Sequence, residues 1–474
     1  MKIYRGLITL GFLIIFTSLP GQVVYISGSG PGYQGAELRF YSQSDPVTKR
    51  FKPIFKINCD KEGSFSCEVP CKGTELIFIK TGIFCFSLYA TEGSKYKLRF
   101  QDFISKPGGE EQNPFFIETK LIPEVVNDTN DINNLIRIFD AEYDPVFNNV
   151  AERVSINYKK SEIPGLIEKL NNVSEAKGSK FFSDYVKYRM IMLNLVAFGS
   201  YHERVEDSTL INEKFVPENP AFLDLIEQMF TGYFRNISFG SLKESLNRAI
   251  ASSSLKDLKA IILKDGKATE NKLQEYIILL NLYSEYYSGS VPFEKVRDIL
   301  SALMSDGSSL FIKEIASILL ERLQVTLPGN VPPDFSLLNS EGRKISLKDF
   351  KGKYLIMTFT RSDNPEAVLE FGILNIWYKK YVNDLEIVTI LTDRDYKSAL
   401  NKMESNGFKW SFLNGSSSDF LEYQYDIRMY PSFLVLDRES RIITDPAPFP
   451  SENLESLIRK IIQEEKSRSG SQNR

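Results

Sequence analysis

Hydrophobic positions change their spacing along the chain, and these changes divide it into three parts. Residues 23 to about 105 form short segments rich in aromatic and β-branched residues, separated by turn signals such as Asp60-Lys61-Glu62-Gly63 and Thr81-Gly82. This pattern predicts a small antiparallel β-sandwich. The predicted strands are 23–27, 36–42, 51–58, 64–69, 75–80 and 84–90.

The second part, from about residue 115 to 326, carries apolar residues three and four positions apart, which is typical of helices packed against a core. Asp131 is placed to cap the first helix, and Pro292 lies near the start of a later one. The predicted helices are 131–147, 181–198, 221–230, 241–250, 272–287, 292–304 and 311–323.

The third part begins after the Pro/Gly-rich segment 325–335, which is the clearest domain boundary in the chain. Strand and helix patterns then alternate, and the last two strands follow each other directly. This order predicts an α/β domain that ends in antiparallel strands. The expected elements are strands 354–360, 385–391, 433–437 and 441–444, and helices 366–381, 396–406 and 454–465.

The first 21 residues read as a signal peptide. Lys2 and Arg5 precede a 14-residue apolar run from Gly6 to Leu19, which is too short to cross a membrane. The alternatives are an uncleaved anchor or a buried helix. We therefore expect an exported protein of the periplasm or cell envelope, with no stable membrane span after cleavage. The expected division is signal peptide 1–21, β-sandwich 22–108, helical domain 109–326, α/β domain 327–466 and disordered tail 467–474.

Composition narrows the function classes. The chain of 474 residues is 42% hydrophobic and 25% charged, with a formal net charge of −3, so nothing predicts attraction to nucleic acid. The single histidine, His202, lies in a polar segment. Because the chain has one histidine, it has almost none of the residues that triad catalysis or a histidine-based metal site requires. The sequence predicts neither a metal nor a cofactor.

The chain has four cysteines, Cys59, Cys67, Cys71 and Cys85, all in one 27-residue stretch of the sandwich. They are candidates for disulfides in an oxidising compartment, and four cysteines allow three pairings. Buried free thiols are the alternative. The cysteines lie on or next to predicted strands and not at a helix N-terminus, so no feature of the sequence lowers their pKa.

The C-terminal third resembles thioredoxin-like domains of the extracytoplasmic TlpA type over about residues 330–466. The segments that carry the resemblance are 331–353, the strand 354–360, MYPSFLVLD at 429–437 and the turn that follows. The resemblance implies a thioredoxin fold with a cis-proline at Pro431. The peroxiredoxins share this fold. The segments GYQGAELRFYS and DKEGSFSCEV also look like envelope proteins with an uncharacterised N-terminal sandwich.

The sequence departs from that family at the reactive site. The family's W-C-x-x-C motif falls on Asp363, Asn364, Pro365, Glu366 and Ala367, so both cysteines are absent. A buried acid of many thioredoxins is replaced by Thr358. Asn cannot supply a nucleophilic sulfur, and Ala cannot resolve a mixed disulfide.

Two interpretations of this segment stay open. Asn is a good N-cap, and Pro and Glu suit the first helical turn, so the segment can be an ordinary helix start. Alternatively it forms the floor of a groove in which Tyr430 and Pro431 pair with an extended peptide, as the resemblance implies.

The sequence thus predicts a non-catalytic protein that binds a peptide or protein partner or acts as a scaffold. Two other hypotheses are a thiol–disulfide oxidoreductase that uses the N-terminal cysteines, and a helical domain that holds the working surface.

Overall fold

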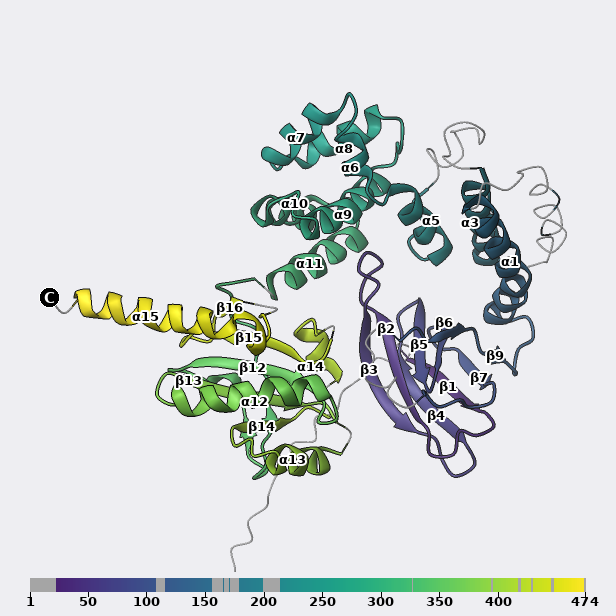
Figure 1. The fold of residues 1–474 in the computed structure, drawn as a ribbon. Coiled ribbons are helices and arrows are strands. Elements are labelled where there is room, and N and C mark those ends of the chain that lie inside the picture. The colour runs from purple at the N-terminus through teal and green to yellow at the C-terminus, as the bar shows by residue number, and fades with distance from the viewer. Residues whose placement is uncertain are drawn as a thin grey trace, which may run out of the picture.

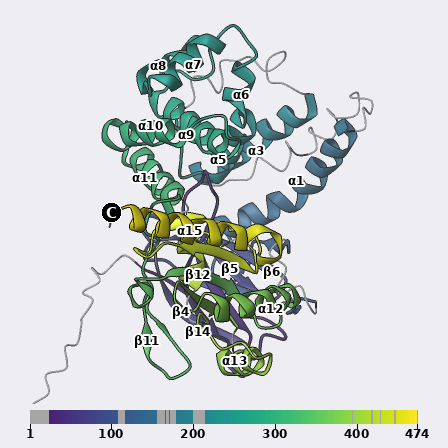
Figure 2. The same cartoon turned by 60° about the vertical axis from the view of Figure 1, so that its left-hand side comes forward.

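The structure is a computed structural model of the chain. The residues that it describes are 23–107, 116–155, 165, 170, 179–198, 214–325, 327–393, 395–416, 419–427, 429–444 and 447–472. The predicted signal peptide and His202 lie outside these residues. Three bodies are visible in Figures 1 and 2, with the helical part above both the N-terminal sandwich and the C-terminal α/β domain.

The N-terminal body is a two-sheet sandwich. One sheet has the strand order β4-β1-β7-β9 and the other β3-β2-β5-β6-β8. Alternate side chains of both sheets, among them Val24, Phe40 and Phe86, fill the core between them. The strands are β1 (Val23–Ser29), β2 (Glu37–Gln43), β3 (Phe51–Asn58), β4 (Ser64–Pro70), β5 (Thr74–Thr81), β6 (Phe84–Thr91), β7 (Lys95–Arg99), β8 (Thr119–Leu121) and β9 (Glu124–Val125).

The sandwich differs from the predicted one in three ways. It is not purely antiparallel, because β1 pairs with β7 and β6 pairs with β8 in parallel. The turn at 60–63 does not close a hairpin, since β3 and β4 belong to different sheets. The sandwich also continues past residue 108, where we expected it to end, because β8 and β9 add to its sheets.

The turn after Thr81 does close a hairpin, as predicted. Thr81 pairs with Phe84 across a two-residue loop. Gly82 has a φ of +50°, and a Cβ there would lie 2.1 Å from the backbone oxygen of Ile104. Both the left-handed backbone and this close approach require glycine.

The middle body is helical, and α9 runs through its centre. The side chains of α9 itself, including Tyr276 and Ile278, are buried on nearly every side of the helix. Asp131 caps α1 as predicted, since its carboxylate accepts the backbone N–H of Asn133 at 2.8 Å. The helices are α1 (Ile132–Ser155), α3 (Lys180–Phe198), α5 (Pro220–Phe230), α6 (Tyr233–Ile237), α7 (Lys243–Ala251), α8 (Leu255–Lys264), α9 (Asn271–Tyr287), α10 (Phe293–Asp306) and α11 (Leu310–Val325). Within the described ranges no helix is both long and apolar enough to cross a membrane.

The C-terminal body has a five-stranded mixed sheet of order β14-β13-β12-β15-β16. Helices α12, α13 and α15 contribute to the apolar cluster on one face, and α14 contributes to the cluster on the other. Its strands are β10 (Leu337–Leu338), β11 (Lys344–Ile345), β12 (Tyr354–Thr360), β13 (Leu385–Leu391), β14 (Ser411–Asn414), β15 (Ser432–Leu436) and β16 (Ile442–Thr444). Its helices are α12 (Pro365–Lys380), α13 (Tyr396–Ser405), α14 (Asp419–Gln424) and α15 (Glu455–Gln472).

Helix α15 extends beyond the predicted end of the domain. Residues 467–472, which we expected to be a disordered tail, continue the helix. No proline interrupts this segment, and helix-forming Glu and Lys residues lead into it.

The three bodies meet around Asp426, which follows α14. Its carboxylate pairs with Arg322 of α11 at 3.1 Å and also with Arg50, which lies between β2 and β3. The ring of Tyr423 lies 5.3 Å from the Arg50 guanidinium and 5.1 Å from that of Arg322. In the same β2–β3 connection, Lys49 pairs with Asp224 of α5 at 2.7 Å. Charged contacts therefore link each body to the other two.

Candidate functional site

The candidate site lies where β12 ends and α12 begins. All seven residues of β12 are buried, and the chain then turns through residues 361–364 into the helix. Asn364 is the N-cap of α12, and its side-chain oxygen accepts the backbone N–H of Ala367 at 3.0 Å. Pro365 occupies the first helical position. The predicted helix start is therefore present.

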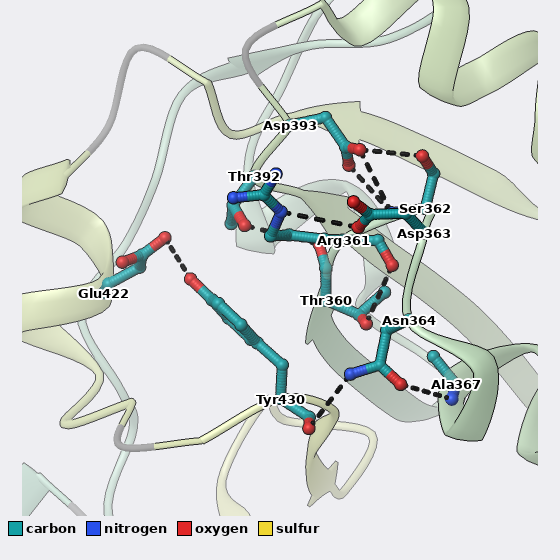
Figure 3. A network of polar contacts seen from close by, with 10 residues as sticks. All are labelled: Thr360, Arg361, Ser362, Asp363, Asn364, Ala367, Thr392, Asp393, Glu422 and Tyr430. Atoms are coloured by element: carbon teal, nitrogen blue, oxygen red, sulfur yellow. Dashed lines mark hydrogen bonds and ion pairs between the residues drawn. The ribbon is translucent and has the colours of Figure 1, made fainter. Parts of the chain in front are cut away.

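Asn364 also connects this helix to the Tyr430–Pro431 segment. The Tyr430–Pro431 peptide bond is cis. The side-chain amide of Asn364 donates to the backbone oxygen of Tyr430 at 3.2 Å (Figure 3). Asn364 thus uses one end of its amide to cap α12 and the other to hold Tyr430. The two segments that the sequence singled out are in contact through this side chain.

The side chain of Tyr430 points away from Asn364 and toward α14, where its hydroxyl donates to Glu422 (Figure 3). Burial and the neighbouring Glu422 carboxylate both raise the pKa of Tyr430. The phenol is therefore neutral at ordinary pH and acts as a hydrogen-bond donor. Glu422 was not predicted from the sequence, because only the tertiary fold brings α14 to this place.

Ser362 and Asp393 form a second polar contact at the site. The Ser362 hydroxyl donates to Asp393 at 2.7 Å, and its backbone N–H donates to the same carboxylate at 2.9 Å. Asp393 follows β13, which is parallel to β12, and the carboxyl ends of neighbouring parallel strands lie together. That rule is the signal by which the pair could have been found. The contact fixes the turn between β12 and α12.

Three more of the predicted residues lie on the rim of the site, and a fourth is buried beneath it. Asp363, Pro365 and Glu366 are exposed, and Asp363 lies 3.5 Å from Arg361. Ala367 is buried in the sheet-facing side of α12. Beneath them, the Thr358 hydroxyl is fully buried and has no hydrogen-bond partner among the described residues. No titratable group occupies this place on β12.

The four cysteines are free thiols in the structure, and they lie in the sandwich, far along the chain from this site. Cys59, Cys71 and Cys85 are buried and Cys67 is half-buried. Burial raises the pKa of Cys67 to about 12 and those of Cys71 and Cys85 to about 11. Burial also raises the pKa of Cys59. A reactive cysteine needs the opposite shift.

A cleft of about 460 Å³ lies between the sandwich and the helical body. Its lining has five carboxylates and one lysine, Lys49, which already pairs with Asp224. The described lining of the cleft thus presents no unpaired cation to an anionic ligand. Among the described residues, no group of three His, Cys, Asp or Glu side chains is placed to hold a metal ion.

Comparison with known proteins identifies the C-terminal body. Residues 328–444 match the AhpC/TSA family model. The C-terminal region is therefore a thioredoxin-like domain, which confirms the resemblance noted in the sequence, and its homologues are thiol–disulfide oxidoreductases that cover about 28% of the chain.

Two relatives illustrate this similarity. The chain is 25% identical to "Thiol-disulfide oxidoreductase ResA" of Bacillus thuringiensis subsp. konkukian over 135 residues, which are 28% of this chain and 78% of the relative. It is 24% identical to the ResA of Bacillus anthracis over 143 residues, 30% of this chain and 80% of the relative.

Solved structures cover a similar share of the chain. A thiol–disulfide oxidoreductase from Bacteroides fragilis is 26% identical, with a TM-score of 0.26 over 28% of this chain and 99% of its own. A thiol:disulfide interchange protein from Bacteroides sp. is 22% identical, with a TM-score of 0.27 over 29% of this chain and 92% of its own.

Proposed function

We propose that this chain is an exported, non-catalytic thioredoxin-fold protein of the cell envelope that binds a peptide or protein partner at the start of α12. One observation carries the proposal: Asn364, which stands where the resemblance places the first cysteine of the family's motif, connects α12 to the Tyr430–Pro431 segment. The side chain keeps the geometry of the site without supplying a nucleophile. The charged start and apolar run of residues 1–21 support export.

The surroundings of Asn364 suit binding. Met429 is 45% exposed directly before Tyr430, and Pro365 and Glu366 are exposed on the opposite rim. The Tyr430 backbone oxygen has two lone pairs, and one of them accepts the hydrogen bond from Asn364. The other remains available to an incoming N–H group. Backbone pairing with an extended segment needs no sulfur chemistry.

The first test is whether the chain has thiol–disulfide reductase activity, measured by reduction of a model disulfide substrate. The purified chain is compared with a variant in which Cys59, Cys67, Cys71 and Cys85 are all serine. We expect no turnover from either protein. Turnover that disappears in the serine variant would place redox chemistry in the sandwich and overturn the proposal.

Binding is tested with a permanently unfolded probe, reduced and carboxymethylated α-lactalbumin. We expect it to slow hydrogen exchange at residues 429–432 and at the first turn of α12. Met429→Asp should weaken binding. Leu338→Asp, at a side chain of similar exposure (43% against 45%), should leave it unchanged. Equal loss in both variants, or protection elsewhere in the chain, would contradict this site.

A further inference from the structure

The cleft between the sandwich and the helical body has two unlike walls. Strand β2 and the start of β5 supply a polar wall, which includes Ser42 and Gln43. Helices α5 and α11 supply an apolar wall, which includes Leu223, Phe311 and Ile315. The volume of about 460 Å³ lies within the range of roughly 300–1,000 Å³ that small-molecule sites occupy. In Figure 1 the cleft lies where the tip of the β2–β3 hairpin rises toward α5 and α11.

The charges in this cleft do not balance. Its described lining holds five carboxylates and one cation, Lys49. Two of the carboxylates are used within the chain, since Asp224 pairs with Lys49 at 2.7 Å and Asp45 accepts two backbone N–H groups of its own turn. The other three are exposed and form no ion pair within the described part of the chain. They are Glu75, Glu218 and Glu314.

These three acids come from different parts of the fold. Glu75 lies on β5, Glu218 lies just before α5, and Glu314 lies on α11. Folding therefore gathers like charges around one cleft and places no cation of the described lining between them. The apolar wall beside the acids strengthens their field, because charges act more strongly where the surroundings have a low dielectric constant. A bound cation would relieve this repulsion.

A buried hydroxyl behind the apolar wall indicates the same kind of ligand. Tyr276 of α9 is fully buried, and its ring centroid lies 6.5 Å from that of Phe311 in the wall. The Tyr276 hydroxyl has no hydrogen-bond partner among the described residues, which is uncommon for a buried polar atom. Burial raises the pKa of Tyr276, and the carboxylates of Glu227, Asp224 and Asp45 raise it further. The hydroxyl is therefore neutral, lies near acids of the cleft, and has an oxygen that can accept an N–H group.

We propose that this cleft binds a small organic cation, with an ammonium group among the three unpaired acids and an apolar body against the α5–α11 wall. The ammonium N–H groups donate to the carboxylates, and the apolar body is removed from water. An anion would be repelled by the same acids. A metal ion fits less well, because no three acids of the described residues are close enough to hold one.

This cation site does not depend on the function proposed above. Its described lining comes from the sandwich and the helical body, whereas the peptide site uses Asn364, Met429 and Tyr430. Binding of the cation and binding of the unfolded probe are separate measurements, so one proposal can fail while the other stands.

Calorimetric titration of the purified full chain at low salt tests the ligand class with three matched probes, phenylbutylamine, phenylbutanol and phenylbutyrate. They share the apolar body and differ in charge. We expect the amine to bind at one site, the alcohol to bind at least tenfold more weakly, and the acid not to bind. Putrescine, a cation without the aromatic body, should also bind at least tenfold more weakly than the amine. No binding of the amine, or equal binding of amine and acid, would overturn the proposal.

Variants test the place of binding. Glu218→Gln/Glu314→Gln keeps the size of both exposed side chains, removes two of the unpaired charges, and should weaken binding of phenylbutylamine at least tenfold. Glu321→Gln removes an exposed acid of α11 that lies outside the lining, and should leave binding unchanged. Melting temperatures measured without the amine show that both variants fold. Unchanged binding in the double variant, or an equal loss in Glu321→Gln, would show that the cleft is not the site.

Discussion

Asp426 and Arg322 form an ion pair at 3.1 Å between the thioredoxin-like domain and the helical body, and each side chain is less than a tenth exposed. Arg50 of the sandwich reaches the same carboxylate. A single carboxylate is therefore shared by two guanidinium groups that come from two other parts of the chain. Because the pair is buried, removal of one partner leaves uncompensated charge.

Asp426→Asn should lower the free energy of the first unfolding transition by about 3–5 kcal/mol, the usual cost of breaking a buried pair. Asn is a fair test because Asp426 has a φ of +53°, which Asn tolerates. Denaturant unfolding gives the measurement. Glu341→Gln removes a partner of Arg343 from an exposed pair, in which the side chains are 60% and 77% exposed, and should cost less than about 1 kcal/mol. Equal costs in the two variants would show that the junction contributes little.

Asn364→Ala should destabilise the thioredoxin-like domain by about 1 kcal/mol or more, because it removes the N-cap and the donor to Tyr430 together. Asn364→Ser keeps a capping oxygen and loses only the donor, so its effect should be smaller. Chemical denaturation of both variants separates the two roles. Equal loss in Ala and Ser would mean that the Tyr430 contact, and not the cap, carries the stability.

The cysteines should react slowly in the folded chain. With a pKa of about 12, Cys67 at pH 8 has roughly a thousandth of the thiolate of a thiol whose pKa is 9. The higher nucleophilicity of a more basic thiolate offsets only part of this, so alkylation by iodoacetamide should be slower in the folded than in the unfolded chain. Mass spectrometry of the native and guanidinium-unfolded chain measures the ratio. Rapid labelling of native Cys67 would show that its thiol is accessible and ionised.

The same shifts predict alkaline instability. A thiol whose pKa is higher in the folded state keeps its proton more readily there than in the unfolded chain. Its contribution to the stability of the folded state is fully present below about pH 9 and is lost as the pH rises. The loss should develop between pH 9 and about 12. Melting temperatures of the chain and of Cys67→Ser over this range give the comparison, and the serine variant should depend less on pH.

Asp140 predicts a pH dependence in acid. Burial raises its pKa from 3.8 to about 6, while Arg189 and the Tyr185 hydroxyl oppose the shift. The folded state binds the Asp140 proton more tightly than the unfolded state does. The contribution of Asp140 to the stability of the folded state is therefore present below about pH 4 and is lost as the pH rises to 6. Asp140→Asn should flatten the stability profile between pH 4 and 6. An unchanged profile would mean that Asp140 stays ionised in the folded state.

The parts that the sequence predicted well are governed by local rules. Asn364-Pro365-Glu366 marks a helix start by capping chemistry alone, and Thr81-Gly82 marks a hairpin by its turn. The contacts that were missed are tertiary. Asp393 and Glu422 reach the site from segments about 30 and 60 residues further along the chain than Ser362. The parallel pairing of β12 and β13 is a signal for Asp393, whereas no pattern in the sequence indicates Glu422. The short strands β8 and β9 were not predicted, because two or three residues cannot show the alternation of apolar and polar positions that marks a strand.

Strands β8 and β9 also decide how the sandwich can be separated from the rest. They cover the edges of β6 and β7, which would otherwise offer unpaired backbone groups to another molecule. A fragment cut at residue 108 would lose both protecting strands and should aggregate through those edges. Strands β8 and β9 therefore belong to the sandwich, and their removal would leave β6 and β7 as unprotected edges that template polymerisation.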